Sequence, residues 1–222
     1  MDINNEMISE DFSLGDRSNF IYFDTEFTGL RKDTTLISIG LVTADNKKFY
    51  AEFTDYDESQ VDDWIRDNVI SNLTHPDYHP KCTEGDLWTI TGTKSDVSHL
   101  LKLWLESIVK PNQILQFVSD VSHYDFVLLI DLITNGGTAF DMPEYISPVC
   151  HDINQDMTLH IFVPKNNEEL SSKPLDYIAF DLNREECVKS MRKDMPDSEN
   201  RKHNSLFDAE IMRIMHQTMW EL

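Results

Sequence analysis

The 222-residue sequence is poor in cysteine and basic residues, and it contains no long hydrophobic run. Cys82, Cys150 and Cys187 form no CxxC pair and no zinc-type spacing, so we expect reduced thiols rather than a disulfide framework. No apolar run approaches the roughly 18 residues that a membrane span requires. The acidic, polar start differs from a signal peptide, and we therefore expect a cytoplasmic protein that does not associate with membranes.

Basic residues are outnumbered by acidic ones, with 19 Lys and Arg against 40 Asp and Glu and a formal net charge of −21. Proteins that bind nucleic acid usually present a basic face, because neutralising phosphates supplies much of the affinity. The charge therefore argues against tight, processive binding of a long polyanion. Clustered carboxylates that bind divalent cations would invert the local field, and single-stranded substrates need fewer phosphate contacts.

The remaining composition predicts a globular protein, since 40% of residues are hydrophobic and 10% aromatic. Residues 1–18 show no apolar periodicity and are predicted to form an acidic N-terminal leader, followed by a single domain over residues 19–222. Apolar, β-rich runs at 20–23, 36–42 and 48–53 predict three strands. Asp45-Asn46 between the last two of these runs indicates a hairpin.

Helical periodicity appears in four later segments, 61–73, 97–108, 124–133 and 205–220. A strand is predicted at 114–118 and a shorter one at 149–153. The stretches 74–93 and 191–200 are predicted as loops, and most of 136–175 favours no single assignment. This order of elements predicts an α/β fold in which helices cover a mixed sheet.

An acidic pair lies where the first predicted strand ends. Asp24 and Glu26 follow the apolar residues 20–23 and precede Thr28-Gly29, which is a turn signal. Residues two apart on a strand point to the same face, so the two carboxylates lie side by side. That arrangement is costly unless a cation lies between them; a solvated strand end is the structural alternative.

Two later segments contribute further acids and one histidine. Asp125 begins an otherwise apolar helix, where an acid also stabilises the helix dipole. Asp208 fits a capping box that begins at Ser205, so both acids have a structural explanation. The cap does not account for His203, which precedes Asp208 by five residues. On a loop before the helix, His203 can point into the same cleft as Asp208.

In chain order, these segments resemble the DEDDh 3′–5′ exonuclease superfamily. Its first motif, DxExTGL, matches residues 24–30, its second matches Asp125 in YDFVLL, and its third, H-x4-D, matches His203 and Asp208. The resemblance runs from about Phe20 to the C-terminus and is greatest for compact single-domain exoribonucleases. It implies an RNase H-like fold, with a mixed β-sheet flanked by helices.

The resemblance also implies a two-metal-ion hydrolase. Asp24, Glu26, Asp125 and Asp208 would hold two divalent ions, Mg²⁺ or Mn²⁺, which are hard cations suited to oxygen ligands. His203 would complete the catalytic set as a general base, because imidazole titrates near neutral pH. The implied reaction releases nucleoside 5′-monophosphates from the 3′ ends of single-stranded or overhanging RNA.

Three residues of the first motif are assigned to substrate binding, namely Thr25, Phe27 and Leu30. Phe27 and Leu30 would lie beside the terminal bases, which single-strand binders commonly hold by stacking and apolar contact. Packing in the core is an equally good explanation for these two side chains.

Two other functions are compatible with the same sequence. The first is a 3′–5′ DNA exonuclease, because no motif identifies a residue that would contact the RNA 2′-OH. The second is a non-catalytic, acidic module that uses the same fold to bind a partner protein. The presence of all five reactive residues argues against the second alternative, whereas the low isoelectric point argues for it.

Overall fold

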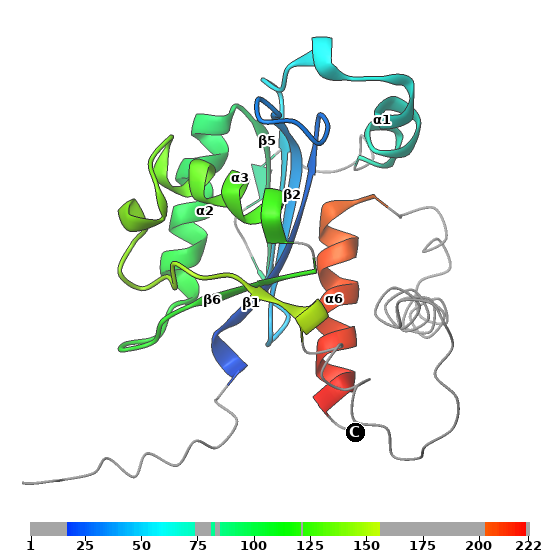
Figure 1. Cartoon of the computed structure of the whole chain (residues 1–222). Coiled ribbons are helices and arrows are strands. Elements are labelled where there is room, and N and C mark those ends of the chain that lie inside the picture. The colour runs from blue at the N-terminus through cyan, green and yellow to red at the C-terminus, as the bar shows by residue number, and fades with distance from the viewer. Residues whose placement is uncertain (1–16, 74–80, 83–84, 121, 156–202, 221–222) are drawn as a thin grey trace, which may run out of the picture.

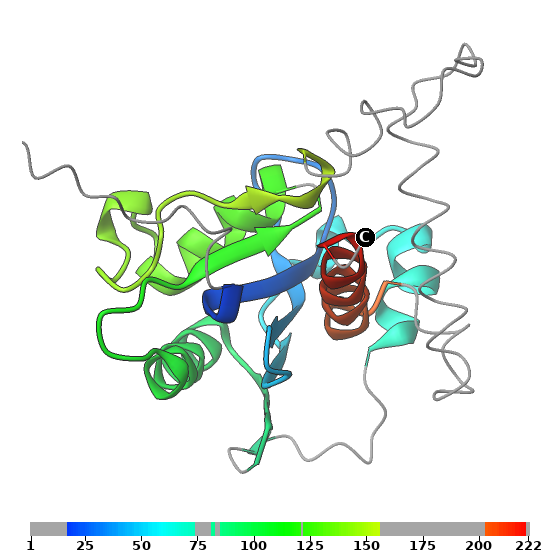
Figure 2. The ribbon, with the colours of Figure 1, turned by 90° about the horizontal axis from the view of Figure 1, so that it is seen from below.

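The computed structural model describes residues 17–73, 81–82, 85–120, 122–155 and 203–220. Within these residues, a seven-stranded mixed sheet runs in the order β4-β5-β3-β2-β1-β6-β7. Helices α2 and α3 cover one face of the sheet and α6 covers the other (Figures 1 and 2). The α/β arrangement predicted from the sequence is therefore confirmed.

The strands divide into an antiparallel centre and parallel flanks. The centre consists of β1 (Phe20–Phe27), β2 (Leu36–Thr43) and β3 (Lys48–Phe53). Next to β3 lies the parallel strand β5 (Leu87–Gly92), which pairs with the short antiparallel β4 (Lys81–Cys82). On the other side of β1, β6 (Gln116–Ser119) and β7 (His151–Asp152) continue the sheet in parallel.

Three long helices and several short turns accompany the strands. The long helices are α2 (Lys94–Ile108), α3 (Ser122–Thr134) and α6 (Ser205–Trp220). The helix α1 (Asp63–Asn68) is followed by a 3-10 turn, η3 (Ile70–Asn72). Further 3-10 turns are η1 (Arg17–Asn19), η2 (Glu58–Gln60) and η4 (Ala139–Asp141). Among the described helices, none combines the length and the apolar character needed to cross a membrane.

Strand β1 separates two hydrophobic clusters, because its side chains alternate between the faces of the sheet. Ile21 and Phe23 point toward α2 and α3, where they join a cluster that includes Trp104. Tyr22 points the other way, into a smaller cluster formed with Val118 and helix α6. This alternation continues to the end of the strand and decides which helix each polar side chain of β1 faces.

Two predictions about the segment between β3 and α2 are wrong. The helix predicted over 61–73 is divided into α1 and η3, and Trp64, assigned to its apolar stripe, is 56% exposed. The loop predicted over 74–93 contains β5, which is too short to give a clear alternating pattern but buries Thr89 and Ile90. Register with β3, a long-range contact, defines this strand.

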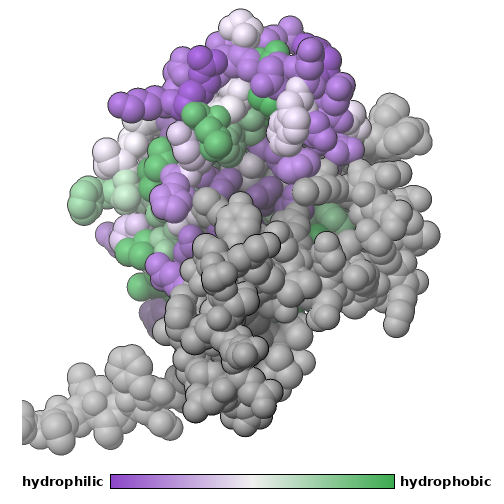
Figure 3. Space-filling model, turned by 45° about the vertical axis from the view of Figure 1, so that its right-hand side comes forward, coloured by the Kyte–Doolittle hydropathy of each residue, from purple (hydrophilic) through white to green (hydrophobic). Residues whose placement is uncertain are grey.

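Other predictions agree with the described residues. The β2–β3 hairpin turns at Asn46, whose φ of 71° is one that asparagine tolerates. Helices α2, α3 and α6 cover the segments predicted from periodicity. The predicted loop at 191–200, residues 1–16 of the leader and Cys187 lie outside the described residues, and the domain boundary at 19 stays a prediction. The described residues on the side shown in Figure 3 are mostly hydrophilic at the surface, with scattered apolar residues.

Candidate functional site

The acidic pair of the first motif lies inside β1 rather than after it. The strand continues to Phe27, so Asp24 and Glu26 hold regular strand positions and point to the α6 face, as Tyr22 does. The neighbouring strand β6 ends at Ser119, shortly after its pairing of Val118 with Tyr22. The two carboxylates therefore lie at the carboxyl end of β6, the edge where open α/β sheets usually bind ligands.

Helix α6 reaches this pair because β2 contains a glycine where the helix begins. Gly40 pairs with Asp24 in the sheet. A Cβ atom at Gly40 would lie 2.2 Å from the backbone nitrogen of Leu206, so no other residue fits. The hydroxyl groups of Ser38 and Ser205 hydrogen-bond at 2.9 Å beside this contact. The first turn of α6, which carries Asp208, is thus placed directly against β1 and β2.

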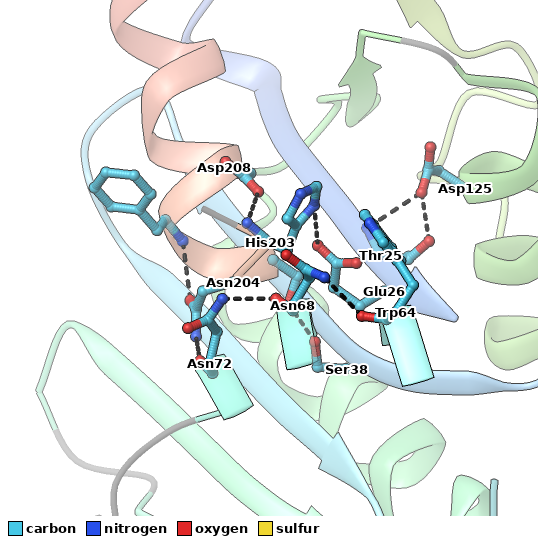
Figure 4. A network of polar contacts seen from close by, with 12 residues as sticks. Thr25, Glu26, Ser38, Trp64, Asn68, Asn72, Asp125, His203, Asn204 and Asp208 are labelled. Carbon is cyan, nitrogen blue, oxygen red and sulfur yellow. Dashed lines mark hydrogen bonds and ion pairs between the residues drawn. The ribbon is translucent and has the colours of Figure 1, made fainter. Parts of the chain in front are cut away.

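His203 and Asp208 join Glu26 at this point (Figure 4). The backbone N–H of His203 donates to Asp208 Oδ2 at 3.1 Å, and His203 Nδ1 lies 3.9 Å from Glu26 Oε1. One ligand atom from each of the three residues lies within 4.8 Å of the others, a spacing that can hold a metal ion. The third motif therefore meets the first in space, as its chemistry requires.

The helix cap at this position differs from the sequence prediction. Ser205 is the first helical residue, and Asn204 is the cap, because its Oδ1 accepts a hydrogen bond from Phe207 N at 3.2 Å. The carboxylate of Asp208 accepts from His203 instead of closing a box with Ser205. The capping-box explanation for Asp208 is wrong, which leaves its carboxylate at the acidic cluster.

Asp125 approaches the same end of β1 from the opposite face. It lies in the first turn of α3 and is buried. Its Oδ1 accepts from the backbone N–H of Thr25 at 3.2 Å and from the Thr25 hydroxyl. The Thr25 side chain is itself buried and directed at Asp125, so its assignment to substrate binding stays a prediction.

The carboxylates at this site perturb one another. Burial, followed by the charges of Glu26, Asp125 and Asp208, raises the pKa of Asp24 well above its usual value. Burial also raises the pKa of Asp125 to about 6, although the hydrogen bonds from Thr25 oppose this change. Without a cation, ionising all these groups near neutral pH is unfavourable. Oxygen-only donors with this excess of negative charge fit Mg²⁺ or Mn²⁺.

Asp120 is a further acid at the site that the motifs did not identify. It follows β6 directly, and its charge raises the pKa values of both Asp24 and Asp125. In the sequence it was visible only as an acid after a predicted strand. Its proximity to Asp24 depends on the parallel register of β6 with β1, which the sequence does not specify.

Aromatic side chains flank the acidic cluster on two sides. The Trp64 ring packs edge-on against His203, with 5.2 Å between ring centroids. Phe27 stacks on Tyr124 at 5.6 Å, and Leu30 is 78% exposed on the loop after β1. The assignment of Phe27 and Leu30 to substrate binding remains a prediction. Trp64 was missed because its spacing placed it among core residues.

Comparisons with known proteins give both a short sequence match and a shared fold. A 55-residue segment is 36% identical to the 3′-5′ exoribonuclease of two Mycobacterium tuberculosis strains, CDC 1551 and H37Rv. The match covers 25% of this chain and 33% of the relative. No family model matches the sequence.

Two solved structures share most of the fold at low sequence identity. The Mg²⁺- and Mn²⁺-bound form of Pop2p from S. pombe superposes with a TM-score of 0.52 at 16% identity, covering 91% of this chain and 83% of Pop2p. Cell-death related nuclease 4 (CRN-4) gives the same TM-score at 14% identity, covering 91% of this chain and 63% of its own. The chain therefore has an RNase H-like fold, which it shares with these two proteins.

Proposed function

We propose that this chain is a 3′–5′ exonuclease that hydrolyses single-stranded or overhanging RNA to nucleoside 5′-monophosphates. One observation carries the proposal: three segments far apart in the sequence bring four carboxylates and one histidine to the same end of β1. Burying like charges together lowers the stability of a protein unless the cluster has a ligand. A structural role does not account for this concentration of acids.

Under this proposal, four carboxylates hold the divalent ions, namely those of Asp24, Glu26, Asp125 and Asp208. When bound, such ions lower the pKa of water and stabilise charge on the attacking and leaving oxygens of a phosphodiester. Asp24 has the strongest need for a cation, since every leading influence on its pKa opposes ionisation. Asp125 is already oriented by Thr25 before any ion binds.

His203 acts as the general base in this mechanism. Glu26 lies 3.9 Å from Nδ1, so a proton taken up by the imidazole places positive charge beside a carboxylate. This arrangement stabilises the imidazolium form that follows proton transfer from water. The main-chain bond from His203 to Asp208 fixes the ring near the cluster without using a ring nitrogen.

RNA is favoured as the substrate because the sequence relative is named a 3′-5′ exoribonuclease, although the match spans only a third of it. Exposed Leu30 and the half-buried Phe27 give the site an apolar border on which a terminal base can pack. The net charge of −21 favours short or single-stranded ends, which require few phosphate contacts. The cytoplasmic location stays a prediction.

The proposal is tested with labelled RNA and DNA oligonucleotides of matched sequence, incubated with Mn²⁺, Mg²⁺ or EDTA. We expect metal-dependent removal of mononucleotides from the 3′ end of RNA, and a loss of about 10²–10⁴-fold in turnover for His203→Ala. Metal binding measured by calorimetry should survive in this variant, because all four carboxylates remain. Faster degradation of DNA than of RNA would show that the protein is the alternative 3′–5′ DNA exonuclease.

Failure to cleave either polymer, together with intact metal binding, would favour the non-catalytic alternative. If His203→Ala instead abolished metal affinity, the histidine would belong to the coordination shell with Glu26 and Asp208, as their mutual distances allow. These two results separate an error in the activity from an error in the role of His203.

A further inference from the structure

Asn204, the residue after His203, links two parts of the fold through its side chain. Its Oδ1 accepts a hydrogen bond from Phe207 N at 3.2 Å and thereby caps α6. Its Nδ2 donates to the backbone oxygen of Asn72 at 3.0 Å, across 132 positions of sequence. A serine or an aspartate would cap the helix equally well, but neither would supply the N–H that reaches Asn72.

Two further hydrogen bonds from side-chain amides to backbone oxygens connect Asn72 to Trp64. Asn72 Nδ2 donates to Asn68 O at 2.6 Å, and Asn68 Nδ2 donates to Trp64 O at 2.9 Å. Trp64 then packs the edge of its ring against His203. These contacts form a closed circuit from His203 through Asn204, Asn72 and Asn68 to Trp64, which contacts His203 again (Figure 4).

The backbone of His203 has an unfavourable conformation that surrounding contacts must maintain. Its φ is 65°, in the left-handed region that is unfavourable for a residue with a side chain. Such a conformation persists only where surrounding contacts impose it. Asp208 accepts a hydrogen bond from the His203 N–H. Asn204, the next residue, is bonded through its side chain to Asn72 of η3.

We propose that Asn204 is a positioning residue, which fixes the His203 imidazole against Glu26 by tying the start of α6 to the α1–η3 segment. The inference rests on the proposed function only where it predicts an effect of Asn204 on turnover. The structural claim, that the Asn204 amide sets the orientation of the His203 ring, is independent of any activity. It also connects the site to α1 and η3, which pack on Ile37 of β2 in a separate hydrophobic cluster.

The test uses Asn204→Ser, which keeps a good helix cap and removes the donor to Asn72. Asn19→Ser is the matched control, because Asn19 Nδ2 makes the same kind of bond, to Ile114 O at 2.7 Å, at η1. Ring-proton chemical shifts of His203, assigned from His203→Ala, report its orientation in the full-length protein without substrate. Trp64→Leu shows which part of these shifts comes from the tryptophan ring.

We expect Asn204→Ser to move the His203 ring signals in the direction that Trp64→Leu moves them, and Asn19→Ser to leave them in place. Unchanged His203 signals in Asn204→Ser would overturn the proposal, whether or not the protein has nuclease activity. Asn204→Asp, which also caps the helix without the donor, repeats the measurement if the serine variant folds poorly.

Turnover supplies the second readout. Asn204→Ser should reduce kcat about tenfold, because small displacements of a catalytic group carry losses of this size or more. The same change should have almost no effect in a His203→Ala background, since the two residues act as one unit. Equal losses in both backgrounds would show a merely structural role and contradict the proposal. A wild-type chain without activity would refute the proposed function while the chemical shifts still decide the role of Asn204.

Discussion

The two faces of β1 hold their acids in different ways. On the α6 face, Asp24 lies among carboxylates, and Glu26, Asp125 and Asp208 all raise its pKa. On the α3 face, Asp125 is also buried but accepts two hydrogen bonds from Thr25. Both acids belong to one cluster, yet among the described residues hydrogen-bond donors are seen only for Asp125.

This difference predicts which acid would depend most on a bound cation for its ionised form. Ionised Asp125 keeps part of its stabilisation when no ion is present, because the Thr25 donors favour the charged form. Ionised Asp24 has no comparable support among the strongest influences on its pKa. The α6 face should therefore lose order or take up protons when metal is removed, whereas the α3 face should retain its geometry.

The largest expected effect comes from breaking the α6 face. Asp24→Asn should reduce turnover by roughly 10³-fold, which corresponds to the several kcal/mol of charge stabilisation that bound ions supply. Calorimetry with Mn²⁺ should show no binding to this variant. Its metal-free form should melt at a higher temperature than the wild type, because one buried like charge is gone. Retention of Mn²⁺ affinity by Asp24→Asn would contradict this comparison.

Metal should stabilise the folded protein by a similar argument. At a concentration 100 times the dissociation constant, a ligand that binds only the folded state adds about 2.7 kcal/mol. For a domain of this size, that corresponds to a rise of roughly 5–10 °C in melting temperature. The double variant Asp125→Asn, Asp208→Asn should lose most of this rise. A melting temperature that ignores millimolar Mn²⁺ in the wild type would argue against a metal site.

The pH dependence of the metal-free protein tests the α3 face. The pKa of Asp125 rises from 3.8 to about 6 on folding, so the protonated acid favours the folded state. The resulting stability is complete below pH 3.8 and is lost as the pH rises through 6, a total of ~3 kcal/mol at about 1.4 kcal/mol per unit. About 1 kcal/mol of it should disappear between pH 5 and 7.

Denaturant unfolding in EDTA at several pH values measures this dependence. Asp125→Asn should flatten the curve by the amount assigned to the carboxylate, while Asp24, whose pKa is raised in the same direction, maintains the remaining slope. A wild-type chain that becomes more stable from pH 5 to 7 in EDTA would mean that the burial of these acids is compensated by some other group.

The smallest effect is expected at Thr25. Thr25→Val keeps the shape of the side chain and removes one of the two donors to Asp125. A hydrogen bond of this kind contributes about 1 kcal/mol, so Mn²⁺ affinity should fall about fivefold. Thr28→Val provides a control, since the Thr28 hydroxyl bonds to Gln60 outside the cluster. Equal effects of the two substitutions would indicate a general loss of stability rather than a role for Thr25.

The sequence was most informative where the chemistry is local. The spacing of Asp24 and Glu26 placed both on one face of a strand, and the structure agrees. The link between His203 and Asp208 was also correct in outline, because both belong to one loop and helix start. The RNase H-like fold implied by the resemblance of these motifs was also confirmed.

The sequence was least informative where contacts cross the sheet. Asp120 joins the cluster only through the register of β6 with β1, and β5 is defined by its pairing with β3. Ser205, predicted as the helix cap, instead bonds through its hydroxyl to that of Ser38, and Asn204 caps α6. Each of these outcomes depends on a partner far away in the chain, which periodicity and spacing do not identify.

The close contact of α6 with β2 at Gly40 has a consequence for biosynthesis. Asp24 lies in the first described strand and Asp208 in the last described helix, so residues 25–207 are synthesised between them. At roughly 5–20 residues per second, that interval is on the order of ten seconds or more. Until α6 is made, Tyr22 lacks the α6 side chains on which it packs in the described part of the fold, and the acidic cluster lacks Asp208. Under the proposed function, a growing chain on the ribosome therefore lacks the complete set of site residues until translation has passed Asp208.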